Sequence, residues 1–275
     1  MTGLELSDAI RLFSEYLRAT GVAHLGPERH GDPGLVGKRL GLVNGSSWIT
    51  LWANYSGRLY LPGVHLVNMG NEATQLNFME AYRQGLLCPP RLNIDAFVRY
   101  ARDLVELAHV DAVLITCSTM NRAYPELQAA LAPQGVPVIQ IDQPMMEQAV
   151  AYGGTVLVVA THGPSVRSTQ ALLEETAVRY RQGVKLAGLT VDTAWECLGI
   201  GDVRGHNEVL AEAIRASLRQ EAVDSVVLAQ LSMAVILFSV PDPTAEFGVP
   251  VLISAQSGFG RVREVLKSLP ERKGD

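Results

Sequence analysis

Residues 111–120, DAVLITCSTM, indicate the fold, because an apolar and β-branched run of strand length ends here in small polar residues. That pattern is typical of a buried parallel strand whose last residues reach the carboxyl edge of its sheet. Ligands of open α/β sheets bind outside that edge. Cys117, at the end of the run, is therefore the first candidate for a reactive group.

A second copy of this stretch lies 113 positions further along the chain, at residues 224–233, DSVVLAQLSM. The same offset carries Met120 onto Met233 and the segment GVPV from residues 135–138 onto residues 248–251. Two segments that agree at one spacing indicate an internal duplication, and the long period indicates two related domain halves. Where the first copy has Cys117, the second has Gln230.

Runs of strand length alternate with helical patterns elsewhere, which predicts a parallel α/β architecture with right-handed crossovers. We expect an N-terminal helix and linker over residues 1–36, a first α/β domain over 37–150 completed by a C-terminal helix at 255–275, and a second α/β domain over 151–254. Strands are predicted at 39–43, 64–68, the run before Cys117, 136–141, 155–160, 185–191, 226–229 and 249–253.

Three local expectations concern the connections between these strands. A helix at residues 94–108 is expected to be capped by Asn93, and the last helix is expected to begin at Phe259. The segment with Trp195 and Cys197 is expected to be a loop that dips toward the sheet edge.

The composition favours a small-molecule partner. With 275 residues, 29.7 kDa, 48% hydrophobic residues and a mean hydropathy of +0.14, the chain is able to bury a substantial core. Its net charge of −5 comes from 28 acidic and 23 basic residues without a long run of either sign, which argues against nucleic acid and membrane surfaces. Three cysteines without metal-like spacing and an N-terminus without a signal-peptide pattern favour a cytoplasmic protein without a thiolate metal site.

Two polar turns follow the first strand of each half, NGSS at residues 44–47 and THGPS at residues 161–165, and both should reach the same edge as Cys117. Their hydroxyls and backbone N–H groups suit an anionic ligand, although ordinary turns and helix caps use the same residues. His162 is the titratable group in these turns and suits general acid–base chemistry near neutral pH, with a surface histidine as the plain alternative.

Cys117 precedes a predicted helix, whose N-terminus would lower the thiol pKa and favour a thiolate base beside a bound carboxylate. The alternative is a buried structural cysteine. The position of Cys117 in the duplicated strand end favours the reactive role.

Cys-Ser-Thr at residues 117–119, Ala160-Thr161 with Ser165 shortly after, and the matching strand end of the second half resemble the aspartate/glutamate/hydantoin racemase superfamily. The resemblance covers about residues 37–268. It implies two pseudo-symmetric domains, each a four-stranded parallel sheet flanked by helices, with the active site in the interdomain cleft and no cofactor or metal. In those racemases two cysteines flank the substrate α-carbon, and one removes a proton while the other returns one from the opposite face.

Carried over by position, the resemblance makes Cys117 the first catalytic cysteine and places Gln230 where the second one should be, with Ser232 completing that turn. The residues that it implies for substrate binding are Asn44, Ser46, Ser47, Ser118, Thr119, Thr161, Ser165 and Gln230.

Glutamine does not exchange protons in this pH range, so the two-thiol mechanism is not available as written. Ser232, His162 or Cys197 is then a candidate for the second acid or base of a racemase or epimerase. Alternatively, Cys117 alone performs one-face chemistry through an enolate-like intermediate, with Gln230 donating a hydrogen bond to the developing charge. A cofactor-independent isomerase with this one-base mechanism is the leading hypothesis.

Three other functions remain open from the sequence. A lyase or decarboxylase would use the same scaffold and the same thiol. A cysteine hydrolase would need His162 within hydrogen-bond reach of Cys117. A non-catalytic binder of small anions needs no chemistry at all. In each case the partner is a small molecule with a carboxylate or carbonyl group, and a homodimer is expected only because dimers are common among proteins that this chain resembles.

Overall fold

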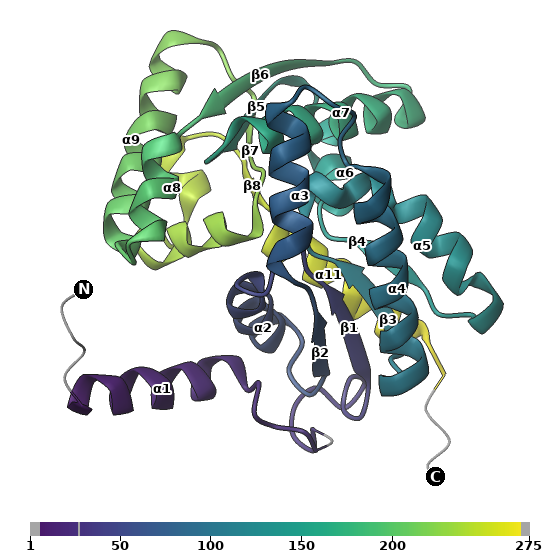
Figure 1. Ribbon diagram of the computed structural model, residues 1–275. Helices are drawn as coiled ribbons and strands as arrows, with labels where there is room; N and C mark the ends of the chain where they lie inside the picture. The colour runs from purple at the N-terminus through teal and green to yellow at the C-terminus, as the bar shows by residue number, and fades with distance from the viewer. Residues whose placement is uncertain (1–5, 27, 271–275) are drawn as a thin grey trace.

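The computed structural model describes residues 6–26 and 28–270, and it contains two four-stranded sheets whose strands are all parallel (Figure 1). The first sheet has the order β2-β1-β3-β4 and the second has the order β6-β5-β7-β8, so the two correspond strand for strand. This confirms the predicted fold class. The strands are β1 Arg39–Val43, β2 His65–Met69, β3 Ala112–Ile115, β4 Val138–Gln140, β5 Gly154–Ala160, β6 Val184–Thr190, β7 Ser225–Leu228 and β8 Val251–Ile253.

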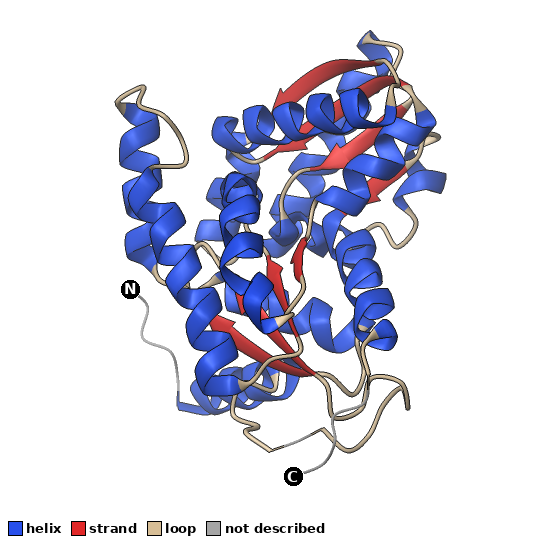
Figure 2. Ribbon diagram, turned by 90° about the vertical axis from the view of Figure 1, so that its right-hand side faces the viewer, coloured by secondary structure: helices blue, strands red, loops and turns tan. Residues whose placement is uncertain are grey.

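Helices flank both sheets (Figure 2). Those that precede β5 in the chain are α1 Leu6–Thr20, α2 Ile49–Tyr60, α3 Glu72–Arg83, α4 Arg91–Ala108, α5 Tyr124–Leu131 and α6 Gln143–Tyr152, with short 3-10 helices η1 Ser118–Ala123 and η2 Ala132–Gln134. Those that follow β5 are α7 Gly163–Tyr180, α8 Asp192–Gly199, α9 Val203–Gln220, η3 Leu231–Phe238, α10 Pro243–Phe247 and α11 Ser254–Ser268.

The duplicated stretches begin with an aspartate because each carboxylate ties two strands together. The Asp111 carboxylate accepts a hydrogen bond from the backbone N–H of Arg39 at 2.6 Å, and the Asp224 carboxylate accepts one from the N–H of Thr155 at 2.6 Å. Each bond therefore joins the strand that carries the duplicated stretch to the start of the neighbouring central strand, β1 or β5.

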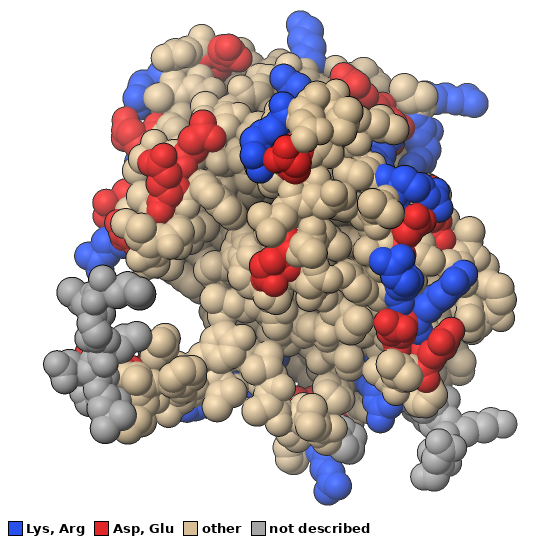
Figure 3. Space-filling model, viewed as in Figure 1, with Lys and Arg blue, Asp and Glu red and all other residues tan. Residues whose placement is uncertain are grey.

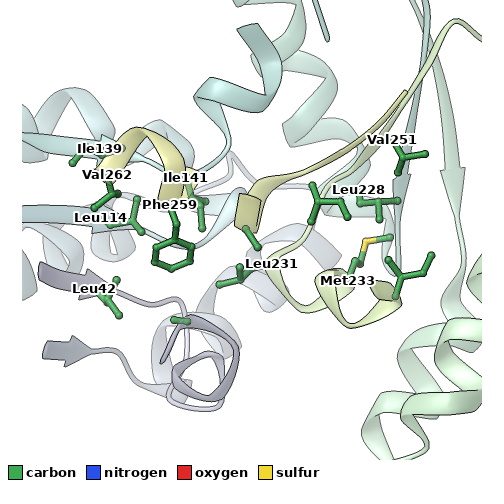
Figure 4. Packing of buried hydrophobic residues seen from close by; sticks show 14 of the residues in the cluster. Leu42, Leu114, Ile139, Ile141, Leu228, Leu231, Met233, Val251, Phe259 and Val262 are labelled. Atoms are coloured by element: carbon green, nitrogen blue, oxygen red, sulfur yellow. The ribbon is translucent and has the colours of Figure 1, made fainter. Parts of the chain in front are cut away.

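One apolar cluster of buried side chains runs through both halves (Figure 4). It connects Leu42 and Leu114 of the first sheet to Leu228 of the second sheet through Phe259 of α11 and Leu231 of η3. Helix α11 also packs on α2, α6 and β4, so the end of the chain returns to the first sheet. Each fully buried side chain of this size contributes about 1.5–3 kcal/mol, and the cluster fixes the two sheets relative to each other.

Three local predictions are wrong. Trp195 and Cys197 lie in helix α8, not in a loop. The sequence did not indicate this helix, because it buries only Ala194 and so shows little apolar periodicity. Helix α4 begins at Arg91 with Pro90 at its N-cap, and Asn93 lies inside it with its amide donating to the Thr74 carbonyl at 2.7 Å.

The third difference is that α11 begins at Ser254, directly after β8, instead of at Phe259. Except for Gln256, the helical residues before Phe259 are small, and Gly258 allows the helix to approach the end of β4 closely. A Cβ atom added to Gly258 would lie 2.6 Å from the Ile141 carbonyl oxygen. Small residues chosen for close approach carry no helical pattern of apolar positions, which is why the sequence did not reveal this first turn.

Helix α1 lies outside both sheets and packs against α2, with Ile10 and Phe13 61% and 64% exposed (Figure 1). The face shown in Figure 3 carries acidic and basic side chains in small mixed groups instead of one large patch of a single sign. Within the described part of the chain, no helix is both long enough and apolar enough to cross a bilayer.

We predict that Asp224→Ala lowers the free energy of unfolding by about 1–2 kcal/mol, because it leaves the Thr155 N–H without its charged acceptor. Urea denaturation followed by circular dichroism measures this loss. Glu106→Ala, at an exposed position of α4, is the control and should change stability by less than about 0.5 kcal/mol. Equal stability of the two variants would show that the carboxylate does not hold β5 and β7 together.

Candidate functional site

A pocket of about 670 Å³, counting the solvent at its open mouth, lies where strands of both sheets end. The turns after β1 and β3 line it from the first half, and the turns after β5 and β7 line it from the second half, with α3 and α8 contributing further walls. It brings together these residues that the sequence singled out: Ser46, Cys117, Ser118, Thr119, His162, Ser165, Gln230 and Ser232.

Three other candidates do not line the pocket but hold its turns in place. Asn44 is fully buried, accepts a hydrogen bond from the Thr116 hydroxyl at 2.6 Å and donates one to Asn68 at 2.9 Å, so it joins the ends of three strands. The backbone N–H and the hydroxyl of Ser47 both donate to Glu72. Thr161 is buried and supports Gln230, as described below.

The Cys117 thiol occupies space that glycine leaves free. A Cβ atom added to Gly45 would lie 2.6 Å from the sulfur, so the β1 turn must have glycine at this point for the thiol to sit where it does. The sulfur also shares a hydrogen bond of 3.2 Å with the Thr119 hydroxyl. Cys117 is the N-cap residue of η1, and its position at the end of β3 therefore brings it against the turn of the neighbouring strand.

Burial raises the pKa of Cys117 above 9.0, its ordinary value, and the nearby carboxyl of Asp142 raises it further. Hydrogen bonds from the Thr119 hydroxyl and from the backbone N–H groups of Thr119 and Met120 oppose that rise without reversing it. The predicted lowering of this pKa by a helix N-terminus is therefore wrong, because the helix is a short 3-10 turn and the cost of burying a thiolate is larger.

His162 enters the pocket from the second half as the N-cap residue of α7. Its ring packs edge-on against Trp195 with centroids 5.7 Å apart, and the Ser165 hydroxyl lies 3.4 Å from both ring nitrogens. Burial lowers the pKa of His162 below 6.5, its ordinary value, and the charge of Asp192 partly offsets this. Near neutral pH the imidazole is therefore uncharged.

Gln230 has its side chain oriented by the neighbouring strand end. Its carbonyl oxygen Oε1 accepts hydrogen bonds from the backbone N–H of Thr161 at 2.6 Å and from the Thr161 hydroxyl at 3.0 Å. Because a backbone N–H only donates, this contact identifies the oxygen end of the amide. The NH₂ end is then left with two N–H donors, and Gln230 lines the pocket.

Asp142 is a buried carboxyl group that the sequence analysis missed. It follows β4, is 1% exposed, and its carboxyl oxygens have no regular hydrogen-bond partner among the described residues. Burial raises the pKa of Asp142 to about 7, and the nearby Ser118 hydroxyl partly opposes the rise. The available signal was a lone aspartate directly after an apolar strand, which is common in ordinary turns.

The remaining walls are mainly apolar and come largely from Trp48, Trp195 and the α3 residues Phe78 and Met79. The contribution of α3 was not foreseen, since its sequence shows only a moderate apolar pattern. Over residues 6–26 and 28–270, no group of three or more His, Cys, Asp or Glu side chains is placed to hold a metal ion.

Residues 91–261 match the family described as Asp/Glu/Hydantoin racemase. No curated protein matches the chain. Among solved structures, an aspartate racemase homologue from Pyrococcus horikoshii has a TM-score of 0.61 at 17% identity, covering 84% of this chain and 100% of that one.

Two further solved structures show the same likeness. A glutamate racemase from Francisella tularensis in complex with D-glutamate has a TM-score of 0.59 at 13% identity, covering 83% of this chain and 81% of that one. An allantoin racemase from Klebsiella pneumoniae has a TM-score of 0.56 at 18% identity, covering 86% and 95%. At these identities the likeness establishes the shared fold alone.

We predict that Asp142→Asn stabilises the chain at pH 8 and changes its stability little at pH 4. The folded-state pKa of Asp142 is raised from 3.8 to about 7, so the wild type loses stability as pH rises through this interval, by up to about 4 kcal/mol. The amide keeps the shape of the carboxyl and cannot ionise. Thermal unfolding at both pH values measures the effect, with Asp103→Asn on α4 as the control. An equal change in stability at pH 4 and pH 8 would contradict the assignment of a buried carboxyl group with a raised pKa.

Proposed function

Because this chain belongs to the Asp/Glu/hydantoin racemase family, we propose that it is a racemase-like isomerase that uses Cys117 and His162 as its acid–base pair. The reaction takes place at the carbon next to a carboxylate or carbonyl group of a small molecule. The observation that carries the proposal is that Cys117 and His162 are the two titratable side chains among the described residues of the pocket. One comes from each half, as the two thiols do in racemases that the chain resembles.

Both groups are uncharged near neutral pH, which suits one as a proton donor and the other as a proton acceptor. In one direction the neutral His162 imidazole takes the proton from the α-carbon, and the bonding electron pair moves onto the carbonyl oxygen to give an enolate. The Cys117 thiol then delivers its own proton to that carbon. The reverse direction starts from the imidazolium and thiolate that this step leaves, and proton exchange with solvent at the open mouth of the pocket returns the pair to its neutral form.

Gln230 does not transfer a proton, as a thiol at the same position would, but donates hydrogen bonds. With its carbonyl oxygen bound to Thr161, its amide N–H groups are available to the enolate oxygen. The hydroxyls of Ser46 and Ser232, which also line the pocket, add donors. A preorganised donor of this kind contributes about 3 kcal/mol when charge develops on the oxygen.

The other functions have less support. A hydrolase would need a hydrogen bond between the thiol and the imidazole, and the contact of the Cys117 sulfur is with Thr119, within the first half. A decarboxylase or other lyase would share the enolate, but the family that the chain matches is described by racemases, which favours proton transfer. In place of the one-base mechanism favoured from the sequence, we propose the pair, because His162 lines the same pocket as Cys117.

We predict that wild-type protein in D₂O incorporates deuterium at the α-carbon of a substrate and inverts its configuration. Cys117→Ala should lower the rate of inversion, and the rate of exchange of the enantiomer whose α-proton faces the thiol, at least about 100-fold. Proton NMR and optical rotation measure the two rates across carboxylates, hydroxy acids, amino acids and hydantoins. Cys197→Ala is the matched control, because that thiol lies on α8 and does not line the pocket, and it should retain both rates.

His162→Gln separates the pair from a single base. Inversion should fall at least about 100-fold, because protonation and deprotonation then depend on the same thiol. Deuterium exchange without inversion of configuration is consistent with the proposal in this variant, because Cys117 still serves one face of the α-carbon. Retention of wild-type inversion in His162→Gln would rule out the imidazole as the second group.

The pH dependence of kcat/KM should be bell-shaped with a wide plateau. Burial lowers the pKa of His162 below 6.5 and raises that of Cys117 above 9.0, so the acidic limb should lie below pH 6.5 and the alkaline limb above pH 9.0. Initial rates in buffers of constant ionic strength measure the profile. A narrow optimum between these two values would contradict the assigned protonation states.

A further inference from the structure

The pocket carries no formally charged side chain among its described lining residues. Two carboxyl groups influence it from outside, Asp142 behind Cys117 and Asp192 beside His162, but neither lines it. An α-amino acid would bring an ammonium group into this space. Without a carboxylate to pair with, a desolvated ammonium finds only hydroxyl and carbonyl oxygens, which do not replace its hydration fully.

The hydrogen-bond donors of the pocket favour a ligand with a carboxylate or carbonyl group over a cation. The Gln230 amide offers N–H groups, because its oxygen is already occupied by Thr161. The Cys117 thiol and the Ser46 and Ser232 hydroxyls are further donors on the lining. These groups suit a carboxylate or an amide carbonyl, and they offer little to a cation.

An aromatic wall occupies one side of the pocket. The ring of Trp195 packs edge-on against Trp48, with centroids 5.5 Å apart, and against His162 at 5.7 Å. Trp48 is held by its indole N–H, which donates to Gln75 at 3.2 Å. Phe78 adds another apolar surface from α3. Edge-to-face partners of this kind suit an aryl or branched alkyl substituent.

Resting on the proposed function, we infer that the substrate is a carboxylate or cyclic amide that bears an aryl or branched alkyl substituent at the reacting carbon and no ammonium group. Such a substituent would lie against Trp48 and Trp195, and the carbonyl oxygens would face the Gln230 amide. An aryl group also stabilises the carbanion, which makes proton removal feasible without an external electron sink.

A pair of isosteric compounds tests this inference directly. 2-Phenylpropionate and phenylglycine share the phenyl ring, the carboxylate and the reacting carbon, and they differ in carrying a methyl or an ammonium group. Deuterium exchange in D₂O is measured for both, for 5-phenylhydantoin and for glutamate, with wild type and Cys117→Ala and with subtraction of the uncatalysed rate. We expect Cys117-dependent exchange on 2-phenylpropionate or 5-phenylhydantoin to be at least tenfold faster than on phenylglycine or glutamate.

Binding is measured separately, so that the inference does not depend on turnover. Quenching of tryptophan fluorescence in Cys117→Ala reports ligand beside Trp48 and Trp195, and 2-phenylpropionate should bind at least tenfold more tightly than phenylglycine. Faster Cys117-dependent exchange on glutamate or phenylglycine would overturn the inference and leave the proposed function intact. Selective binding without exchange on any compound would support the inference and overturn the proposed function, and the absence of both would overturn both.

Gln75→Glu distinguishes the two substrate classes. The new carboxylate keeps an acceptor for the Trp48 indole N–H and adds a negative charge to the pocket lining. Binding of 2-phenylpropionate should weaken at least tenfold, while binding of 5-phenylhydantoin in its neutral form should change less than threefold. Gln128→Glu, at an exposed position of α5, is the control and should change neither. Equal weakening of both ligands by Gln75→Glu would show that charge in the pocket does not set the preference.

Discussion

The placement of the two halves of the pocket relative to each other depends on the apolar cluster that joins the two sheets. Leu231 shows the connection most directly, because its side chain belongs to that cluster and it also lines the pocket one residue after Gln230. Met120 has a comparable place in the first half, because it is buried in a separate apolar cluster of that half and lines the pocket three residues after Cys117. Close packing of these side chains leaves the two strand ends little freedom. The core therefore fixes the strand ends, and polar contacts such as that between Gln230 and Thr161 orient the side chains on them.

Burial in this site also explains the protonation states that the proposed chemistry needs. Removing a group from water penalises its charged form, so the same environment raises the pKa of Cys117 and lowers that of His162. It likewise raises the pKa of Asp142 to about 7. A neutral acid and a neutral base are the outcome before substrate binds, and the imidazolium and thiolate form only as a result of proton transfer. Donors such as the Gln230 amide are then effective, because they are already oriented before charge develops on the enolate oxygen.

The sequence revealed those features that depend on local pattern and on the repeat. The offset between residues 111–120 and 224–233 predicted two related sheets, and the small polar ends of the strands predicted which turns meet. Side-chain direction could not be read in the same way. Asn44 and Thr161 lie at the right strand ends, yet they bond to other turns instead of lining the pocket. Such pairing among polar residues is decided by tertiary contacts, as is the burial that sets the pKa of Asp142.

Cys117 and Gln230 occupy equivalent backbone positions in the two halves of the chain. Both strand ends form the same turn, with the Met120 N–H donating to the Cys117 carbonyl at 3.0 Å and the Met233 N–H donating to the Gln230 carbonyl at 3.0 Å. Gln230, being longer than cysteine, reaches the Thr161 N–H, which a thiol would leave without this acceptor. On the proposed mechanism, the second half therefore presents a fixed hydrogen-bond donor, Gln230, where the first half presents the acid–base group Cys117. The proton transfer of the second half is carried out by His162 in the turn after β5, which pairs directly with β7. His162 and Gln230 therefore act from adjacent strand ends.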